Sequence, residues 1–219
     1  MRSGDEVGDN GEKAKKLMIA EDSPSSPRVW LPPTALVLIS TLLALGGEHL
    51  STILGYDRAL IDQGQLWRLV TGNLVHLGAW HLFLNALSLV LLVALCPEVA
   101  TAREWLQRVV LIGLGMSLGL YFFYPALASY VGLSGLVYGL FAFGFIRQAQ
   151  RGDKFAIGAL LFLACRIGWE LILGAPESEQ ALIGGGVVAE SHLYGVMAAI
   201  LYGFAFGWFR SRTSRPADK

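Results

Sequence analysis

The chain has 219 residues, of which 54% are hydrophobic and only 16% are charged. Soluble domains carry about a quarter charged residues, so this composition argues against an ordinary water-soluble enzyme and favours a membrane protein. Basic and acidic side chains, 17 of each, balance to zero net charge and give no basic surface for nucleic acid. The two cysteines are too few for a disulfide scaffold, and we expect free thiols.

Residues 1–28 are polar and mixed in charge, and we expect a disordered N-terminal tail. The first apolar run after it also fits a signal peptide core, but the long polar stretch ahead of it favours a membrane span. A membrane domain is predicted over 29–210, followed by a short basic tail at 211–219. Six apolar runs in this domain predict helices at 30–46, 76–96, 105–124, 132–146, 155–173 and 187–209.

Lysine and arginine are distributed unevenly among the predicted loops. Most lie in the tail, in the second and fourth loops and after the last run, whereas the opposite side has only Arg58 and Arg68. Because basic segments stay in the cytoplasm, this bias places both termini there and makes the number of spans even. We therefore predict an all-α membrane protein, a bundle of six transmembrane helices with both termini cytoplasmic.

Polar side chains near the outer ends of the even-numbered spans reach a similar depth. About 20 Å of helix separates Ser134 from Arg147 at the inner edge, in a hydrocarbon layer about 30 Å thick. Asn85 reaches a similar height on the second span, with His81 one turn away on the same face. His192 lies slightly higher on the sixth. Polar groups at such a depth are costly and indicate a functional site.

This group of side chains suits nucleophilic attack on a carbonyl. His192 can act as general base for the Ser134 hydroxyl. His81, Asn85 and the Ser134 amide can donate hydrogen bonds to the resulting oxyanion. No Asp or Glu is evident as a third member, so we predict a Ser134–His192 dyad.

Neighbouring residues fit the same interpretation. Gly132 and Gly135 allow a tight backbone approach around the serine. Tyr138, one turn below Ser134, can stack on the ring of His192. These residues are predicted to support the catalytic pair rather than to react.

Each candidate also has a purely structural interpretation. A serine between glycines in a membrane helix usually serves packing, and an intramembrane His or Asn often only joins helices. For His76 we favour a role in ordering the first loop. Arg166 and Glu170 have the i, i+4 spacing of an ion pair facing the bundle; the alternative is a substrate gate that reads a charged feature. The shared depth, not any single residue, supports a catalytic site.

Four short motifs occur in a fixed order along the chain. They are Trp67-Arg68, then His76, His81 and Asn85, then Gly132-Leu133-Ser134-Gly135 with Tyr138, and finally His192-Leu193-Tyr194-Gly195. Their order and spacing resemble the rhomboid intramembrane serine proteases over about residues 30–209. The resemblance implies a six-helix rhomboid-like bundle that needs no cofactor and no metal. It also implies a serine endopeptidase that cleaves transmembrane protein substrates in the lipid bilayer.

The resemblance carries roles over to individual residues. It implies that Ser134 is the nucleophile, His192 the general base, His81 and Asn85 the oxyanion donors, and Tyr138 the stacking partner. The Trp-Arg motif of the first loop is implied to be structural. The fifth span and the loop after it are implied to form a lateral gate and lid.

Within the family, the motifs are most similar to the rhombosortases. This implies a bacterial inner-membrane enzyme whose site opens to the periplasm and whose substrates carry a C-terminal Gly-Gly motif. Acyl transfer to another nucleophile is then an alternative to hydrolysis. Leu133 departs from the small residue often found before the serine, and the motifs explain neither the N-terminal tail nor the oligomeric state.

Two rival classes stay open. One is a catalytically silent rhomboid-like binding protein, although silent relatives usually lack either the serine or the histidine that this chain retains. The other is a small transporter, which would use the same polar residues as a pathway. The sequence shows no inverted repeat, and this counts against the transporter.

Overall fold

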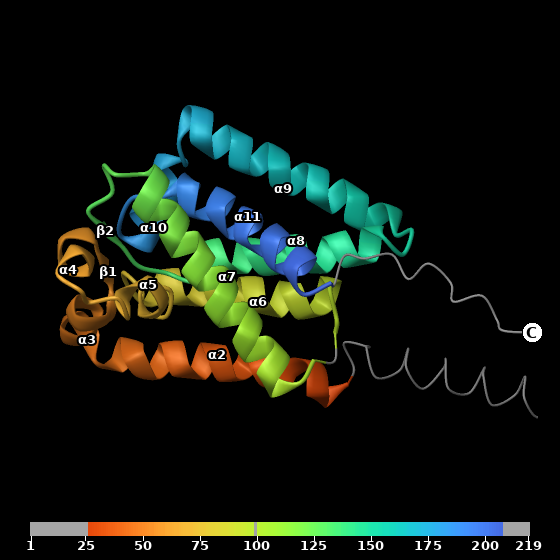
Figure 1. Ribbon diagram of the computed structural model, residues 1–219, viewed down its shortest axis with the longest axis horizontal. Coiled ribbons are helices and arrows are strands. Elements are labelled where there is room, and N and C mark those ends of the chain that lie inside the picture. The colour runs from red at the N-terminus through yellow and green to blue at the C-terminus, as the bar shows by residue number, and fades with distance from the viewer. Residues whose placement is uncertain (1–25, 99, 208–219) are drawn as a thin grey trace, which may run out of the picture.

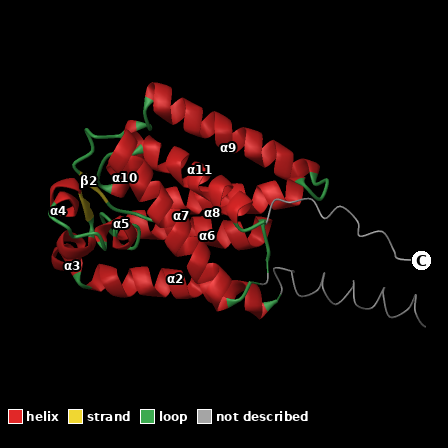
Figure 2. Ribbon diagram, viewed as in Figure 1, coloured by secondary structure: helices red, strands yellow, loops and turns green. Residues whose placement is uncertain are grey.

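The computed structural model describes residues 26–98 and 100–207. The predicted disordered tail therefore lies outside the described residues except for its last three positions, where Pro27 already opens a helix. The basic tail at 211–219 lies outside them as well. Most of the described chain is helical (Figure 2).

Six helices of 16 to 22 residues form a bundle (Figure 1). Each overlaps one predicted apolar run, so the six helix predictions are confirmed. Of the described helices, α2, α7 and α9 are long and apolar enough to cross a membrane, and α6 is apolar but shorter. The six are α2 (Pro27–Leu45), α6 (Ala79–Leu95), α7 (Ala102–Phe123), α8 (Ser134–Ala149), α9 (Lys154–Leu173) and α11 (Ala189–Ala205).

Short elements fill the connections at one end of the bundle. The two strands pair antiparallel, with Tyr56 opposite Tyr130, and so join the first loop to the segment ahead of α8. In Figure 1 these short elements lie at the left-hand end, opposite the start of α2 and the turn between α8 and α9. They are α3 (Gly47–Leu54), β1 (Tyr56–Asp57), α4 (Arg58–Asp62), α5 (Arg68–Thr71), β2 (Ser129–Tyr130) and α10 (Glu177–Ile183).

A buried arginine holds the first loop together. The Arg68 guanidinium donates to the carbonyl oxygens of Thr52 at 2.8 Å and Gly55 at 2.6 Å, and its Nε donates to Gln65 at 2.8 Å. A buried guanidinium needs several acceptors to offset its lost hydration, and these contacts supply them. The geometry agrees with the structural role expected for the Trp-Arg motif.

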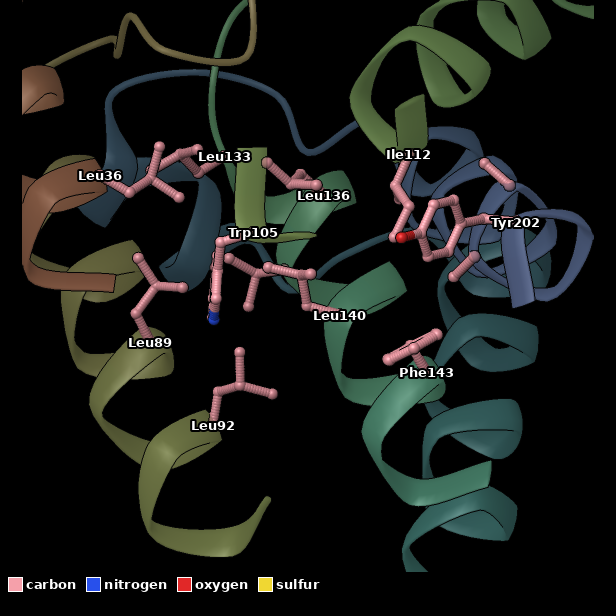
Figure 3. Packing of buried hydrophobic residues seen from close by; sticks show 13 residues of the cluster. Leu36, Leu89, Leu92, Trp105, Ile112, Leu133, Leu136, Leu140, Phe143 and Tyr202 are labelled. Atoms are coloured by element: carbon pink, nitrogen blue, oxygen red, sulfur yellow. The ribbon is translucent and has the colours of Figure 1, made fainter. Parts of the chain in front are cut away.

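Helix α8 lies at the centre of the bundle and contacts α6, α7, α9 and α11. Its apolar side chains pack into one core with residues of α2, α6, α7 and α11 (Figure 3). The core includes Leu36, Leu89, Leu92, Trp105, Ile112, Leu136, Leu140, Phe143 and Tyr202. This packing fixes the position of the helix that begins at Ser134.

Glycines bring α8 and α11 unusually close together. A Cβ atom on Gly139 would lie 2.6 Å from the carbonyl oxygen of Gly195, and one on Gly195 would collide with the carbonyl oxygen of Gly135. Small residues permit such backbone approach between membrane helices. The two helices that carry Ser134 and His192 are therefore in direct backbone contact.

Large apolar side chains cover much of the outer surface. Leu42, Phe162, Ile172 and Leu201 are all more than 60% exposed, and they come from α2, α9 and α11. Apolar surface on this scale is unfavourable in water and suits contact with lipid tails. The chain is a multi-pass integral membrane protein by this surface and by its long apolar helices.

Candidate active site

Ser134 is the first residue of α8. Its backbone N–H therefore has no acceptor within the helix, and the positive end of the helix dipole lies beside its hydroxyl. The segment ahead of it is held on both sides: the Gly132 N–H donates to the Gly72 carbonyl at 3.1 Å, and the Tyr130 hydroxyl donates to the Gly132 carbonyl at 3.0 Å. The serine thus sits at a fixed, polar helix start.

His192 reaches the serine from the first turn of α11. Its Nε2 atom lies 3.1 Å from the Oγ of Ser134, within hydrogen-bond distance. The ring stacks on Tyr138 with centroids 4.0 Å apart and an interplanar angle of 4°. Stacking fixes the plane of the imidazole and leaves both ring nitrogens free for hydrogen bonds. A serine with an adjacent, oriented histidine is the arrangement of an activated nucleophile.

Glu170 of α9 occupies the other side of the same imidazole. Its Oε2 lies 2.7 Å from the Nδ1 of His192, and its side chain is fully buried. The dyad predicted from the sequence includes no acidic partner for His192. The signal was present, because helical rise places Glu170 in the outer half of the membrane, the half predicted for His192.

Arg166 and Glu170 form the ion pair that their spacing predicted. Nη2 of Arg166 lies 2.8 Å from Oε1 of Glu170, without hydrogen-bond alignment, and 2.7 Å from Oε2 of Glu179 on α10. Among the described residues that line the cavity beside Ser134, Glu179 is present but Arg166 and Glu170 are not. Of the two residues, Glu170 contacts His192, and neither borders the cavity that the described residues form. The substrate gate stays an alternative to the structural ion pair.

His81 and Asn85 lie on the face of α6 that borders this cavity. The Leu77 N–H donates to His81 Nδ1 at 3.5 Å, and an accepting Nδ1 leaves the proton on Nε2. Asn85 donates one amide N–H to the His81 carbonyl at 3.0 Å, which leaves its second N–H available. Both side chains can therefore offer donors to a group bound next to Ser134.

Gly132 permits the close approach of His81 to the serine segment. Its φ angle is +128°, a conformation that L side chains rarely adopt. A Cβ atom there would lie 2.6 Å from Cε1 and 2.7 Å from Nε2 of His81. Gly135, the second predicted glycine, would place a Cβ 2.7 Å from the Ser191 carbonyl on α11. Both glycines are needed for close contacts, one with each histidine-bearing helix.

His76 is buried and packs edge-on against His81, with ring centroids 5.1 Å apart at 78°. Neither of its ring nitrogens has a hydrogen-bond partner within the part of the chain that the structure describes. It also does not border the cavity as the described residues define it. The contact with the His81 ring is structural rather than catalytic, whereas the role expected from the sequence, ordering of the first loop, stays a prediction.

A cavity of about 720 Å³ connects these groups. Its walls come from α3, β1, α4, α5, α6, β2, α8, α10 and α11. Its polar lining includes Ser134, His192, His81 and Asn85. A concave site with a few convergent polar groups is the usual form of a substrate pocket. In the described ranges, no group of three or more His, Cys, Asp or Glu side chains is placed to hold a metal ion.

Comparison with known proteins gives two matches. A family model described as Rhomboid domain matches residues 63–209. A protein of Bacillus subtilis (strain 168) named "Putative rhomboid protease YdcA" is 23% identical over 153 residues, which cover 70% of this chain and 73% of that protein. This matched range includes Ser134, His192, His81 and Asn85, which line the cavity.

Proposed function

Because the chain belongs to the rhomboid family, whose members are in general intramembrane serine proteases, we propose that it is an intramembrane serine endopeptidase. Ser134 is the nucleophile and His192 the general base. The observation that carries the proposal is the 3.1 Å contact between His192 Nε2 and Ser134 Oγ at the wall of the cavity.

The chemistry follows from where each proton goes. Ser134 Oγ attacks the substrate carbonyl while its proton moves to Nε2 of His192. His81, Asn85 and the Ser134 N–H donate to the developing oxyanion. The protonated histidine then gives its proton to the leaving amine, and an acyl-enzyme on Ser134 remains. Water, deprotonated by the same nitrogen, releases the acyl group and restores the serine hydroxyl.

The membrane arrangement we propose is a six-span bundle with both termini in the cytoplasm. The excess of Lys and Arg in the second and fourth loops supports it. Further support comes from the start of α2 and the α8–α9 turn, which lie at the same end of the bundle in Figure 1. The cavity then opens near the outer face, and substrate helices are cut there after local unwinding.

The substrate class we propose is that of the rhombosortases, with a Gly-Gly motif ahead of a membrane helix and a basic tail. Support comes from the Gly-Leu-Ser-Gly and His-Leu-Tyr-Gly strings of the sequence. The enzyme would then act in a bacterial inner membrane on the periplasmic side. Release of the acyl group to a nucleophile other than water is compatible with the same acyl-enzyme.

Fluorophosphonate labelling tests the proposal without a known substrate. The purified wild-type protein should label, Ser134→Ala should not, and His192→Ala should label about 10²–10⁴-fold more slowly because the general base is lost. Ser178→Ala, an exposed serine on α10, is the matched control and should label like wild type. Folded wild-type protein that stays unlabelled both in detergent and in lipid would support a silent binding protein and overturn the protease.

A further inference from the structure

The His192 imidazole is held between two oxygen atoms. Ser134 Oγ is 3.1 Å from Nε2, and Glu170 Oε2 is 2.7 Å from Nδ1. These contacts come from three different helices, α8, α11 and α9. The order hydroxyl, imidazole, carboxylate is that of a hydrolytic triad, in which the acid acts on the nitrogen remote from the serine.

The carboxylate fixes the tautomer of the histidine. An ionised carboxylate can only accept hydrogen bonds, so Nδ1 must carry the proton in this contact. Nε2 then has a free lone pair that faces the serine hydroxyl. The reverse tautomer would point an N–H at Ser134 and could not take its proton. Glu170 therefore selects the one neutral form of His192 that can act as a base.

The carboxylate also balances the charge that catalysis creates. When Nε2 takes the serine proton, a positive imidazolium forms among buried groups, where an isolated charge is costly. Glu170 is already in contact with the ring and needs no rearrangement at that moment. The proton on Nδ1 stays on the histidine, and Glu170 stays ionised throughout.

Arg166 and Glu179 hold the carboxylate in place. A buried carboxylate is unstable without a cationic partner, and Arg166 supplies one at 2.8 Å. Arg166 is fixed in turn by Glu179 of α10 at 2.7 Å. The carboxylates of Glu170 and Glu179 and the guanidinium of Arg166 together carry one net negative charge. The imidazolium of His192, when it forms, neutralises this charge. A chain of contacts therefore runs from Glu179 at the wall of the cavity, through Arg166 and Glu170 of α9, to the Nδ1 atom of His192.

We propose that Glu170 is the positioning residue of a Ser134–His192–Glu170 triad and that the Arg166–Glu179 pair clamps its carboxylate. The proposal rests on the protease function above. It adds an acidic member that comes from α9, a helix for which the sequence predicts only an ion pair or a gate.

The experiment measures fluorophosphonate labelling as kinact and KI separately. Glu170→Gln keeps the size of the side chain but loses its charge, and its amide N–H₂ can stabilise the wrong tautomer. We expect kinact to fall about 10²–10⁴-fold, as for loss of a triad acid, with KI little changed. Glu170→Asp keeps the charge and should recover part of the loss. A purely structural role would not distinguish Gln from Asp in this order.

Glu179→Gln and Glu177→Gln form a matched pair on α10. Glu179 binds Arg166, whereas Glu177 is exposed on the same helix. We expect a smaller fall in kinact for Glu179→Gln, about three- to ten-fold, and none for Glu177→Gln. This pair also decides the case if Glu170→Gln does not fold, because equal kinact values for the two α10 variants would overturn the clamp and the triad it serves.

The two proposals fail in different ways. Normal labelling of folded Glu170→Gln, with Ser134→Ala inactive, would overturn the triad and leave the protease with a dyad. Absence of labelling in folded wild-type protein would overturn the protease, and the triad with it. Thermal unfolding of each variant separates loss of fold from loss of reactivity.

Discussion

At the scale of single residues, the site depends on how closely backbone and rings approach each other. Gly132 is the clearest case, because its φ of +128° and the ring of His81 leave no room for a Cβ. The Tyr130 hydroxyl also donates a hydrogen bond to the Gly132 carbonyl oxygen at 3.0 Å and so holds this backbone in place. The position of His81, a proposed oxyanion donor, relative to Ser134 thus depends on the absence of a side chain at Gly132.

Gly132→Ala should therefore reduce reactivity. The new methyl group must displace His81 or strain the backbone, at a cost of about 1–3 kcal/mol. We expect a lower unfolding temperature and slower fluorophosphonate labelling. Gly78→Ala is the control, because Gly78 is extended and a Cβ there meets nothing within 4 Å. Equal labelling of the two variants would show that the close approach of His81 is unimportant.

At the scale of elements, α8 and α11 act as one unit. Their glycine contact brings the serine at the start of one helix to the histidine in the first turn of the other. The helix α9 packs against both and contributes the carboxylate. The geometry of the site therefore depends on how α8, α9 and α11 pack against one another, not on one loop.

Gly195→Ala tests the crossing. Its Cβ would collide with the Gly135 carbonyl, so α11 must move away from α8. Overpacking of this kind costs about 1–3 kcal/mol, and we expect a lower melting temperature with slower labelling. Gly168→Ala on α9 has open space around its Cβ and should be neutral or stabilising. If Gly195→Ala matched Gly168→Ala in both measurements, the crossing would not depend on a missing side chain.

Sequence reasoning was most successful for the long helices. Lipid-facing and core-facing positions are both apolar, so continuous runs mark these helices clearly. It missed α3, α4, α5 and the strand pair, because a few residues held by distant contacts such as those of Arg68 leave no periodic pattern. It missed the hydrogen bond between Glu170 and His192. The i, i+4 spacing pairs Glu170 with Arg166 on the same helix, but the sequence does not reveal which face of α9 is turned toward α11.

At the scale of the whole molecule, the cavity lies at the end of the bundle that carries the strand pair. The α8–α9 turn, with Arg151 and Lys154 beside it, lies at the other end (Figure 1). In the proposed topology, the asymmetry of basic residues orients the molecule so that the cavity faces the outer side of the membrane.

Cysteine accessibility tests this orientation. In a background without Cys96 and Cys165, Gln63→Cys near the cavity end should react with a membrane-impermeant maleimide from the periplasmic side. Arg151→Cys at the opposite end should react only after the membrane is opened. Both positions are exposed, so access rather than burial decides the result. The reverse pattern would place the site on the cytoplasmic side.

In the proposed triad, the hydrogen bond between Glu170 of α9 and His192 of α11 couples the position of α9 to the reactivity of Ser134. Any outward swing of α9 that widens the path between helices carries Glu170 away from His192 and leaves the imidazole without its partner. If substrate helices enter past α9, the proposed triad predicts that entry and cleavage occur in different conformations of the protein. We then expect each substrate to remain bound while α9 returns and the contact between Glu170 and His192 forms again.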